Sequence, residues 1–593
     1  MNHQQVTSRS LPRGHQEVTQ IAQICENTDC LTRLKSAIMS EFFGENMKKI
    51  LAAILVSTGL FSAHTLPVAA QETVTINGVE AQRVVIAPPQ NALARSIKSG
   101  LAQNYANARK GTRAYADAQK LYYFYGARHF EPLWLSEDSS GQIVFSPNAL
   151  KVLDVFEKSY LEGLRPADYL TSDLSLSGNF TDPNRLAALE TAFSTAAVKY
   201  AQNAVGGRIN PRSVSSQFDQ HPPRINGGEF LVKLVNSPAP DELLLSLSPT
   251  NREFLGLKAA LATHYRGEAE DAIIVPNGKL LKLGMSDPRV PILRERLGLP
   301  EIIGDTKYDE ELIVAIEAFQ TEMGLFVDGV TGPATVAALN GGTTASKEDL
   351  IANMERWRWM PRDLGDFYVF VNIPEFRLAV MQGDKETYST RVVVGKPDHM
   401  TPIFSDEIEH VVVNPYWNVP PSIAKDEIGP RLANNPGYLA ARNMELLSGG
   451  RVVNASNIDW STNSINNFRI RQRPGNRNAL GTIKFLFPNS HSVYLHDTPS
   501  RSLFSRSQRA YSHGCVRVQN PLDFAGALLV KDRNLSRNSI QSQFGSSERW
   551  NNLSTKIPVH LAYFTLRVKE DGSIRSYSDI YGHNARLKRL LAN

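Results

Sequence analysis

The chain has 593 residues, too many for a single hydrophobic core, so we expect several domains. Its composition, 42% apolar and 21% charged, is that of a soluble globular protein. The net charge of +5 is slight for this length and no long run of Lys or Arg occurs, which argues against nucleic acid as a partner. A mildly basic surface at most favours an anionic polymer.

The first strongly apolar segment begins just after Met47. Two lysines precede an apolar run over residues 50–63, and small side chains at 68–70 precede a cleavable bond. This order is typical of a secretory signal peptide. The run is shorter than the ~20 residues of a membrane span, although a buried helix or an uncleaved anchor are the alternatives. We expect residues 47–70 to be the signal, translation to start at Met47, and residues 1–46 to be a mis-assigned or disordered leader.

This prediction changes the cysteine count. Cys25 and Cys30 lie in the leader, so the exported protein would keep Cys515 alone. A disulfide then has no partner, and a lone thiol in an oxidising compartment is a liability unless it is used.

The N-terminal half is predicted to be helical. After a lead-in at 71–97, we expect a helical scaffold domain over 98–270, with helices at 148–164 and at 187–207, where Gly207 is a C-cap signal. No catalytic cluster is evident in this region.

A compact three-helix module is predicted over residues 278–342. Asp287-Pro288 should open the first helix, apolar residues at 3–4 spacing mark the second, and Pro333 should start the third. The stretches "DPRVPILRERLGL", "YDEELIVAIEAFQTEMGL" and "DGVTGPATVAALN" resemble the peptidoglycan-binding domain type 1 family. The resemblance implies wall targeting or a bracing role, and names no ligand residues.

The C-terminal region, residues 350–590, changes to a period of two and is predicted to be β-rich. A hairpin should run from Tyr368 through a Pro374-Glu375 turn, and "TRVVVG", "EHVVVNPYW", "TIKFLFPN" and "SVYLHD" are further strands. A helix should open at Asn520-Pro521, and one or two strands should follow. Between about 415 and 475 the pattern breaks into Pro, Asn and Gly with short helical pieces, which indicates an insertion.

The stretch "YSHGCVRVQ" carries the chemistry. Only a thiolate attacks carbonyls, and forming one near neutral pH needs an imidazole or a positive field. His513 and Cys515 share a face if the segment is extended, Gly514 lets a substrate approach, and the Gly514 and Cys515 amides are candidate oxyanion donors. His496 is a second imidazole. Arg517, on the same face, is a candidate to hold a substrate carboxylate or lock the loop.

Cys515 could instead be a metal ligand or a buried core side chain. A zinc site could use His496, His513 and Cys515, but ligands at i and i+2 close a tetrahedron poorly and no second Cys or acidic ligand is evident nearby. We therefore expect no metal and no cofactor. Burial as a small core side chain is the usual fate of a lone Cys, but the polar surroundings of Cys515 speak against it.

The segment "YLHDTPSRSLFSRSQRAYSHGCVRV" resembles the L,D-transpeptidase (YkuD) catalytic motif, a histidine followed at a set distance by Ser/Thr-His-Gly-Cys. Fifteen residues, Asp497 to Tyr511, separate His496 from Ser512. Some members carry Asn where this chain has Arg517. With "MERWRWMP", "NPYWNVPPSIAKDEI" and "NRNALGTIKFLFPNS", the chain resembles the multidomain YcbB type of this family. That resemblance implies a multidomain α+β fold with a helical scaffold, a peptidoglycan-binding-like domain and a catalytic domain with a capping insertion.

The resemblance also implies residue roles. Cys515 would be the nucleophile, His513 its general base, and His496 would line the oxyanion or acceptor side, while Ser512 and Gly514 shape the loop. Tyr416, Trp417 and Asn418 would line the donor groove, although packing at a strand end explains all three equally well, and Arg517 would be a further substrate-binding residue.

The implied activity is peptidoglycan L,D-transpeptidation in the periplasm. Cys515 would attack the diaminopimelate carbonyl of a tetrapeptide stem, expel D-alanine and pass the acyl group to a diaminopimelate amine, forming a 3→3 cross-link. Carbapenems would then acylate the same thiol. Water as acceptor would give a carboxypeptidase or endopeptidase, and a protein amine would anchor an envelope protein. The non-enzyme alternative is a wall-binding scaffold. The sequence is silent on oligomeric state.

Overall fold

The structure is a computed structural model that describes residues 71–76, 79–84, 86–174, 182–266, 273–323, 325–341, 345–532 and 534–593. The expected leader and signal peptide lie outside the described residues. The chain divides into two compact units, Met1–Pro132 and Leu133–Asn593. Within the described ranges, no helix has both the length and the apolarity needed to cross a membrane.

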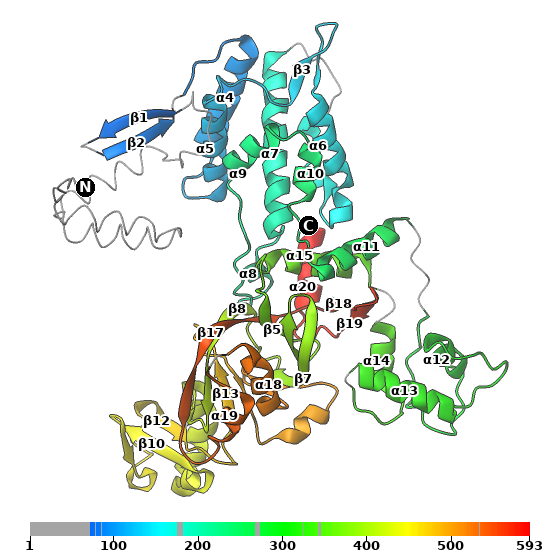
Figure 1. The fold of residues 1–593 in the computed structure, drawn as a ribbon, viewed down its shortest axis with the longest axis vertical. Helices are drawn as coiled ribbons and strands as arrows, with labels where there is room; N and C mark the ends of the chain where they lie inside the picture. The colour runs from blue at the N-terminus through cyan, green and yellow to red at the C-terminus, as the bar shows by residue number, and fades with distance from the viewer. Residues whose placement is uncertain are drawn as a thin grey trace, which may run out of the picture. The chain divides into compact units, whose positions relative to one another are not determined.

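The described part of the first unit, from residue 71 onward, contains a hairpin and two helices (Figure 1). Asn91 and Thr112 cap the helices, because their side-chain oxygens accept hydrogen bonds from backbone N–H groups of the first turns. The elements are antiparallel β1 (Gln71–Ile76) and β2 (Val79–Val84), then α4 (Ala92–Asn107) and α5 (Arg113–Gly126). The hairpin occupies the segment predicted as a lead-in.

The helical part of the second unit is built around the long helix α7 (Pro183–Gly206). Gly207 follows it at φ 82°, a left-handed conformation that favours glycine and ends the helix where the sequence predicted. The predicted helix at 148–164 is shorter: α6 ends at Glu157 and a 3₁₀ turn continues to Glu162. The other elements are β3 (Leu135–Glu137), β4 (Ile143–Phe145), α6 (Pro147–Glu157), α8 (Pro211–Val214), α9 (Gly227–Val235), α10 (Pro240–Leu245) and α11 (Arg252–Arg266).

The three predicted helices of the small module are present as α12 (Val290–Arg296), α13 (Glu310–Glu322) and α14 (Pro333–Gly341). The first begins later than expected. The carboxylate of Asp287 accepts from the backbone and the guanidinium of Arg289, which holds these residues in a turn before the helix. A small core joins the three helices; its buried members are Val275, Leu281, Val290, Leu293, Tyr308, Leu312, Ile316, Val336 and Leu339.

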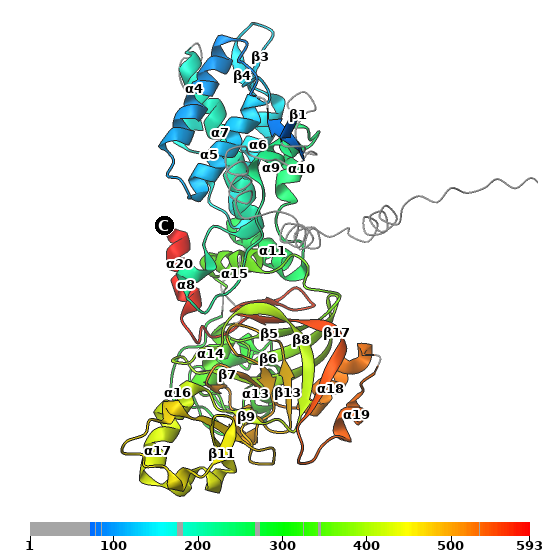
Figure 2. The same ribbon diagram turned by 90° about the vertical axis from the view of Figure 1, so that its left-hand side faces the viewer.

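The β-rich region is a nine-stranded sheet in the order β15-β7-β16-β14-β13-β8-β17-β5-β6. Because β6 also pairs with β7, the sheet closes on itself (Figure 2). The strands are β5 (Phe367–Asn372), β6 (Arg377–Gln382), β7 (Lys385–Gly395), β8 (Phe404–Val413), β13 (Ile483–Leu486), β14 (Leu495–His496), β15 (Ala510–Ser512), β16 (Val516–Val518) and β17 (Arg549–Ala562). The predicted β5–β6 hairpin is confirmed.

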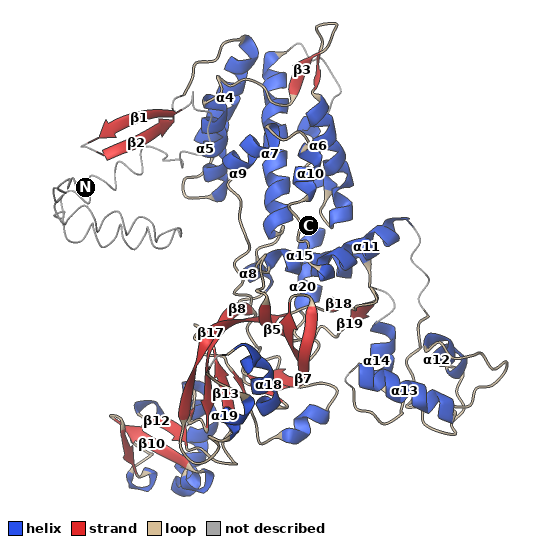
Figure 3. Cartoon of the chain, in the orientation of Figure 1, coloured by secondary structure: helices blue, strands red, loops and turns tan. Residues whose placement is uncertain are grey.

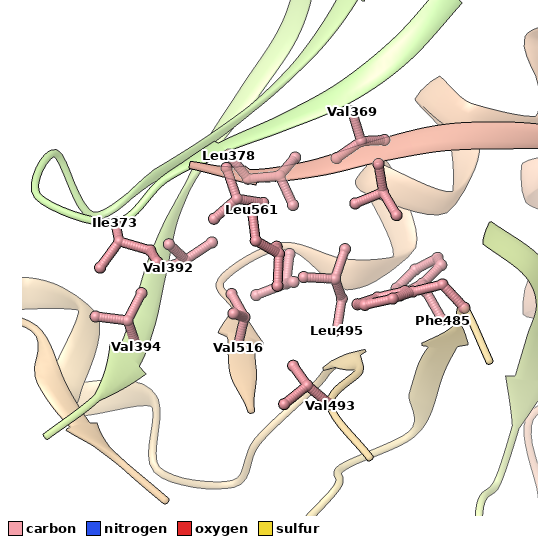
Figure 4. Packing of buried hydrophobic residues seen from close by; sticks show 14 of the residues in the cluster. Val369, Ile373, Leu378, Val392, Val394, Phe485, Val493, Leu495, Val516 and Leu561 are labelled. Carbon is pink, nitrogen blue, oxygen red and sulfur yellow. The ribbon is translucent and has the colours of Figure 1, made fainter. Parts of the chain in front are cut away.

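One apolar core fills this closed sheet (Figure 4). Leu495 and Val516, from the two strands next to the reactive segment, are fully buried in it. Four helices accompany the sheet: α15 (Lys347–Trp359), α18 (Pro521–Leu528), α19 (Arg537–Gln541) and α20 (His583–Ala592), together with a short hairpin of β18 (Leu566–Val568) and β19 (Ile574–Ser576). The helix predicted from Pro521 is α18, whereas α20 was not predicted.

The insertion folds as a small body with a sheet of its own, shown in red beside its helices in Figure 3. The sheet runs β11-β10-β12-β9, and its strands are β9 (Trp417–Asn418), β10 (Met444–Ser448), β11 (Arg451–Val453) and β12 (Arg469–Gln472). The helices α16 (Pro421–Ile423) and α17 (Gly429–Asn434) flank a π-helical turn at Ala424–Ile428. The sequence predicted the short helices but not this sheet.

Candidate active site

The segment that carries Cys515 is a tight bend between β15 and β16. Gly514 has φ +112°, a conformation that L side chains rarely adopt. The hydroxyl of Ser512 donates to the carbonyl of Cys515 and accepts from the Gly514 N–H at 3.1 Å. Ser512 therefore shapes the bend. The Gly514 amide, expected to be an oxyanion donor, is already engaged by Ser512, which leaves the Cys515 amide as the candidate donor.

A threonine from a distant loop holds the other side of this bend. The hydroxyl of Thr401, fully buried, donates to the Gly514 carbonyl at 2.8 Å and accepts from the Gly395 N–H at 2.9 Å. The hydroxyl of Tyr581 in turn donates to the Gly395 carbonyl. No local pattern in the sequence connects these residues with the cysteine segment.

We predict that Thr401→Val destabilises the protein by ~1–3 kcal/mol, since it leaves the Gly395 N–H and the Gly514 carbonyl buried without this partner. Denaturant unfolding measures the change. The matched control is Thr387→Val at an exposed position on the same strand as Gly395, which should change stability by no more than ~0.5 kcal/mol. Equal stability of the two variants would contradict the prediction.

The parallel pairing of β14 with β16 sets which side chains meet. Leu495 is opposite Val516, and His496 is opposite Arg517. Because side chains alternate along a strand, Tyr494, His496, Cys515 and Arg517 share one face while Leu495 and Val516 enter the core on the other. The structure thus brings His496, Cys515 and Arg517 together and adds Tyr494, which sequence reasoning missed.

The thiol of Cys515 is half-buried in this face. Burial raises its pKa above the ordinary value, and this outweighs the smaller lowering by hydrogen bonds from Tyr494 and by the charge of Arg517. The resting side chain is therefore a protonated thiol, and its reaction with a carbonyl requires a base.

Alkylation of Cys515 should accordingly have a pH midpoint above the ~8.5 of an ordinary cysteine, because a raised pKa keeps the unreactive thiol protonated to higher pH. Iodoacetamide labelling rates, read by mass spectrometry on the peptide that contains Cys515, measure this midpoint. Glutathione labelled in parallel is the reference, and a midpoint below that of glutathione would contradict the raised pKa.

The imidazole of His496 is buried and held in one tautomer. Its Nδ1 hydrogen-bonds the carbonyl of Asp497, so the proton sits on Nδ1 and Nε2 keeps its lone pair. Burial, and then the charge of Arg517, lower its pKa to about 3. The imidazole is therefore neutral at neutral pH.

Asp497, whose carbonyl bonds His496, is itself held in place by its carboxylate. Its carboxylate accepts from the backbone and the hydroxyl of Thr482, both at 2.9 Å, and pairs with Arg501 at 2.6 Å. Gly481, at φ +61°, is needed here because a Cβ would lie 2.3 Å from the Asp497 carboxyl group.

His513 is held by the insertion. Its Nε2 lies 2.9 Å from Oε1 of Glu427 in the π-helical turn, and its ring stands edge-on to His399 with centroids 4.8 Å apart. Desolvation is the largest cause that lowers its pKa, and Glu427 opposes it. Among the described residues, this imidazole contacts Glu427 and His399 and makes no hydrogen bond to Cys515.

Arg517 connects the reactive face with a pocket of about 530 Å³ between the insertion and the closed sheet. Its Nε is buried and has no hydrogen-bond partner among the described residues. The pocket is lined by Trp417, Ala441, Arg442, Met444, Gln472, Arg477, Ala479, Thr498, Pro499, Ser500 and Arg517. Within the described part of the chain, three arginines and no acidic side chain line this space, which suits a ligand with carboxylates.

The three candidate groove residues are placed differently. Trp417 lines the pocket. Tyr416 does not; its ring lies 4.6 Å from the guanidinium of Arg471, and its N–H donates to Glu548. Asn418 pairs with Arg471 in the insertion sheet.

Residues 366–535 match the family described as "L,D-transpeptidase catalytic domain", which is the region that carries the reactive face. Residues 119–261 match "Scaffold domain" and residues 295–339 match "Putative peptidoglycan binding domain". Three parts of this multidomain chain therefore match, in order, a scaffold domain, a domain of the peptidoglycan-binding type and an L,D-transpeptidase catalytic domain.

Two curated proteins are similar to parts of the chain. A "Putative L,D-transpeptidase" of Haemophilus influenzae is 35% identical over 247 residues, 40% of this chain and 49% of that protein. The "N-acetylmuramoyl-L-alanine amidase CwlL" of Bacillus licheniformis is 40% identical over 67 residues, 10% of this chain and 19% of that protein. The chain thus spans about half of the first relative and a fifth of the second.

Solved structures also match. An L,D-transpeptidase of Xylanimonas cellulosilytica is 16% identical with a TM-score of 0.17, covering 48% of this chain and 99% of that one. An L,D-transpeptidase of Stackebrandtia nassauensis is 14% identical with a TM-score of 0.21, covering 49% and 97%.

Proposed function

We propose that this chain is a peptidoglycan L,D-transpeptidase that forms 3→3 cross-links through a Cys515 thioester. The observation that carries the proposal is the single sheet face on which Cys515, His496 and Arg517 lie together, beside an arginine-lined pocket. A cysteine nucleophile, a neutral imidazole and fixed cations are the parts that acyl transfer from an anionic peptide needs.

The first half-reaction makes the thioester. The Sγ of Cys515 attacks the carbonyl at the L-centre of diaminopimelate in a tetrapeptide stem, its proton passes to an imidazole, and the C–N bond to D-alanine breaks as the leaving amine takes that proton. Arg517, Arg442 and Arg477 suit the carboxylates of the donor stem, since guanidinium groups bind carboxylates with paired hydrogen bonds.

We propose His496, rather than His513, as the base of this step. His496 lies on the same face as Cys515, and the hydrogen bond from its Nδ1 to the Asp497 carbonyl leaves Nε2 as the nitrogen that can accept a proton. A protonated thiol beside a neutral imidazole is the arrangement in which a general base acts during the attack. His513 faces Glu427 instead and is available for the second half-reaction.

The second half-reaction passes the acyl group to an amine, for which we propose the side-chain amine of diaminopimelate on another stem. The peptidoglycan-binding-type domain and the scaffold domain support a site of action at the cell wall. We extend this to an exported, periplasmic protein, as the signal pattern at 47–70 predicts.

The test is purified protein lacking residues 1–70, incubated with disaccharide-tetrapeptide and read by mass spectrometry. We expect free D-alanine and a dimer whose mass is the sum of two tetrapeptide monomers less one D-alanine, and an intact-mass increase on Cys515 with a carbapenem. Release of D-alanine with monomeric tripeptide only would point to water as acceptor. Absence of both D-alanine release and carbapenem adduct would refute the proposal.

A further inference from the structure

One carboxylate from the insertion stands over the reactive segment. Glu427 lies in the π-helical turn Ala424–Ile428, is exposed, and reaches Nε2 of His513, two residues from Cys515, at 2.9 Å. The other charges that act on His513 most strongly are those of His399, Lys396 and Arg517. π-helical turns are rare and are frequently found at functional sites.

A second acid, Asp398, also lies near these cations, but its carboxylate already pairs with two of them. Asp398 lies 3.2 Å from Nζ of Lys396 and 3.5 Å from Nδ1 of His399. Glu427 pairs with His513, whose pKa is lowered below the ordinary value chiefly by desolvation, and the charge of Glu427 also acts on Arg431. Glu427 is therefore the carboxylate that contacts the reactive segment itself, through His513.

The two sides of the reactive segment therefore differ in charge. Arg517, Arg442 and Arg477 line the pocket and suit a donor with carboxylates, whereas Glu427 lies on the side of His513, away from that pocket's lining. A substrate group that is attracted to a carboxylate and must give up a proton before it reacts is a primary ammonium.

Building on the proposed function, we propose that Glu427, with His513, is the binding site for the protonated primary amine of the acyl acceptor. Glu427 and His513 select an amine over water, and the insertion supplies this half of the site. This assigns the acceptor to a class, a primary alkyl ammonium on a peptide, and leaves the donor to the arginine side.

The ammonium of the acceptor transfers one proton to the carboxylate of Glu427, either directly or through His513. The neutral amine attacks the thioester carbonyl, the C–N bond forms and the C–S bond breaks. The thiolate of Cys515 leaves and takes the second proton that the new amide nitrogen releases. Glu427, being exposed, returns its proton to solvent.

The experiment separates the two half-reactions in Glu427→Gln. We expect D-alanine release and carbapenem acylation to stay within about twofold of the parent, while the ratio of cross-linked dimer to hydrolysed tripeptide falls ~10–100-fold, the range for loss of one charge-assisted hydrogen bond. Glu427→Asp keeps the charge and should recover part of the ratio. Asp426→Asn, an exposed neighbour in the same turn, is the matched control and should keep the parent ratio.

A competing acceptor gives a second readout. Raising the concentration of a simple primary amine, such as a free diamino acid, should increase its capture of the thioester with a half-saturation that is at least tenfold higher in Glu427→Gln. An unchanged dimer-to-tripeptide ratio would overturn the proposal, as would equal losses in both half-reactions, which would indicate only a latch for the insertion. If the parent itself releases no D-alanine and takes no carbapenem, the proposed function fails instead.

Discussion

Cys515→Ala is expected to abolish every covalent step: no carbapenem adduct, no D-alanine release and no dimer. Sγ is the atom that bonds to the substrate carbonyl, so no neighbouring group replaces it, and the loss should be ~10³-fold or more. Cys515→Ser should be nearly as inactive, because a hydroxyl is a far weaker nucleophile beside a base that is neutral with a pKa of about 3. Intact-mass spectrometry and muropeptide analysis measure these losses.

The fold should survive the change. Cys515 is half-buried, and its Sγ makes a long contact, 3.9 Å to the carbonyl of Ser492, besides its hydrogen bonds with Tyr494, so its truncation costs little packing. The thermal unfolding midpoint of Cys515→Ala should therefore match that of the parent protein. If the helical modules bind wall material, the variant should bind it as the parent does. A Cys515→Ala protein that released D-alanine at the parent rate would remove Cys515 from the mechanism.

The residues of the reactive bend could be predicted because they are contiguous, whereas its shape differs from the extended segment that the sequence suggested. Ser512, Gly514 and Cys515 are contiguous, and the bend depends on a hydroxyl bonding two nearby backbone groups and on a glycine at φ +112°. The strand that ends at His496 was likewise predicted from its own pattern, "SVYLHD". Tyr494 was also within reach, since it precedes His496 by two residues and shares its face.

The rest of the site comes from pairings between distant segments, which single-sequence reasoning does not reach. Thr401, Tyr581 and Glu427 approach the bend only because the sheet closes and the insertion folds over it. Their local sequences carry no signal of this, as each is one polar residue in a loop or turn. The same holds for the engagement of the Gly514 amide, which depends on the rotamer of Ser512.

Fold prediction divided along similar lines. The hairpin of β5 and β6 was predictable because two alternating runs flank a tight turn. The insertion sheet was not, because β9 and β11 have two and three residues, too short to establish a period. The core of the insertion contains buried residues from several short segments, among them Leu432 and Ile470. No periodic pattern in the sequence links these segments.

The second large effect distinguishes the two histidines. His496→Gln is expected to slow acylation of Cys515 by ~10²–10⁴-fold, the usual cost of a lost general base, because the thiol is protonated at rest and its proton then has no acceptor on that face. His513→Gln should slow acylation by less than about tenfold and act on the dimer-to-tripeptide ratio instead, since His513 is paired with Glu427. Stopped-flow acylation by a chromogenic β-lactam measures the first step, and product mass measures the second.

The pH dependence gives the same distinction without a substitution. A base whose pKa is about 3 remains neutral as the pH falls from 8 to 5, so acylation in the parent should show no acid limb from imidazole protonation in that range. A base with a pKa near the ordinary ~6.5 of histidine would lose activity there as it gains a proton. An acid limb near 6 that disappears in His513→Gln, together with a His496→Gln variant that acylates normally, would return the role of base to His513 and reverse the assignment of the two half-sites.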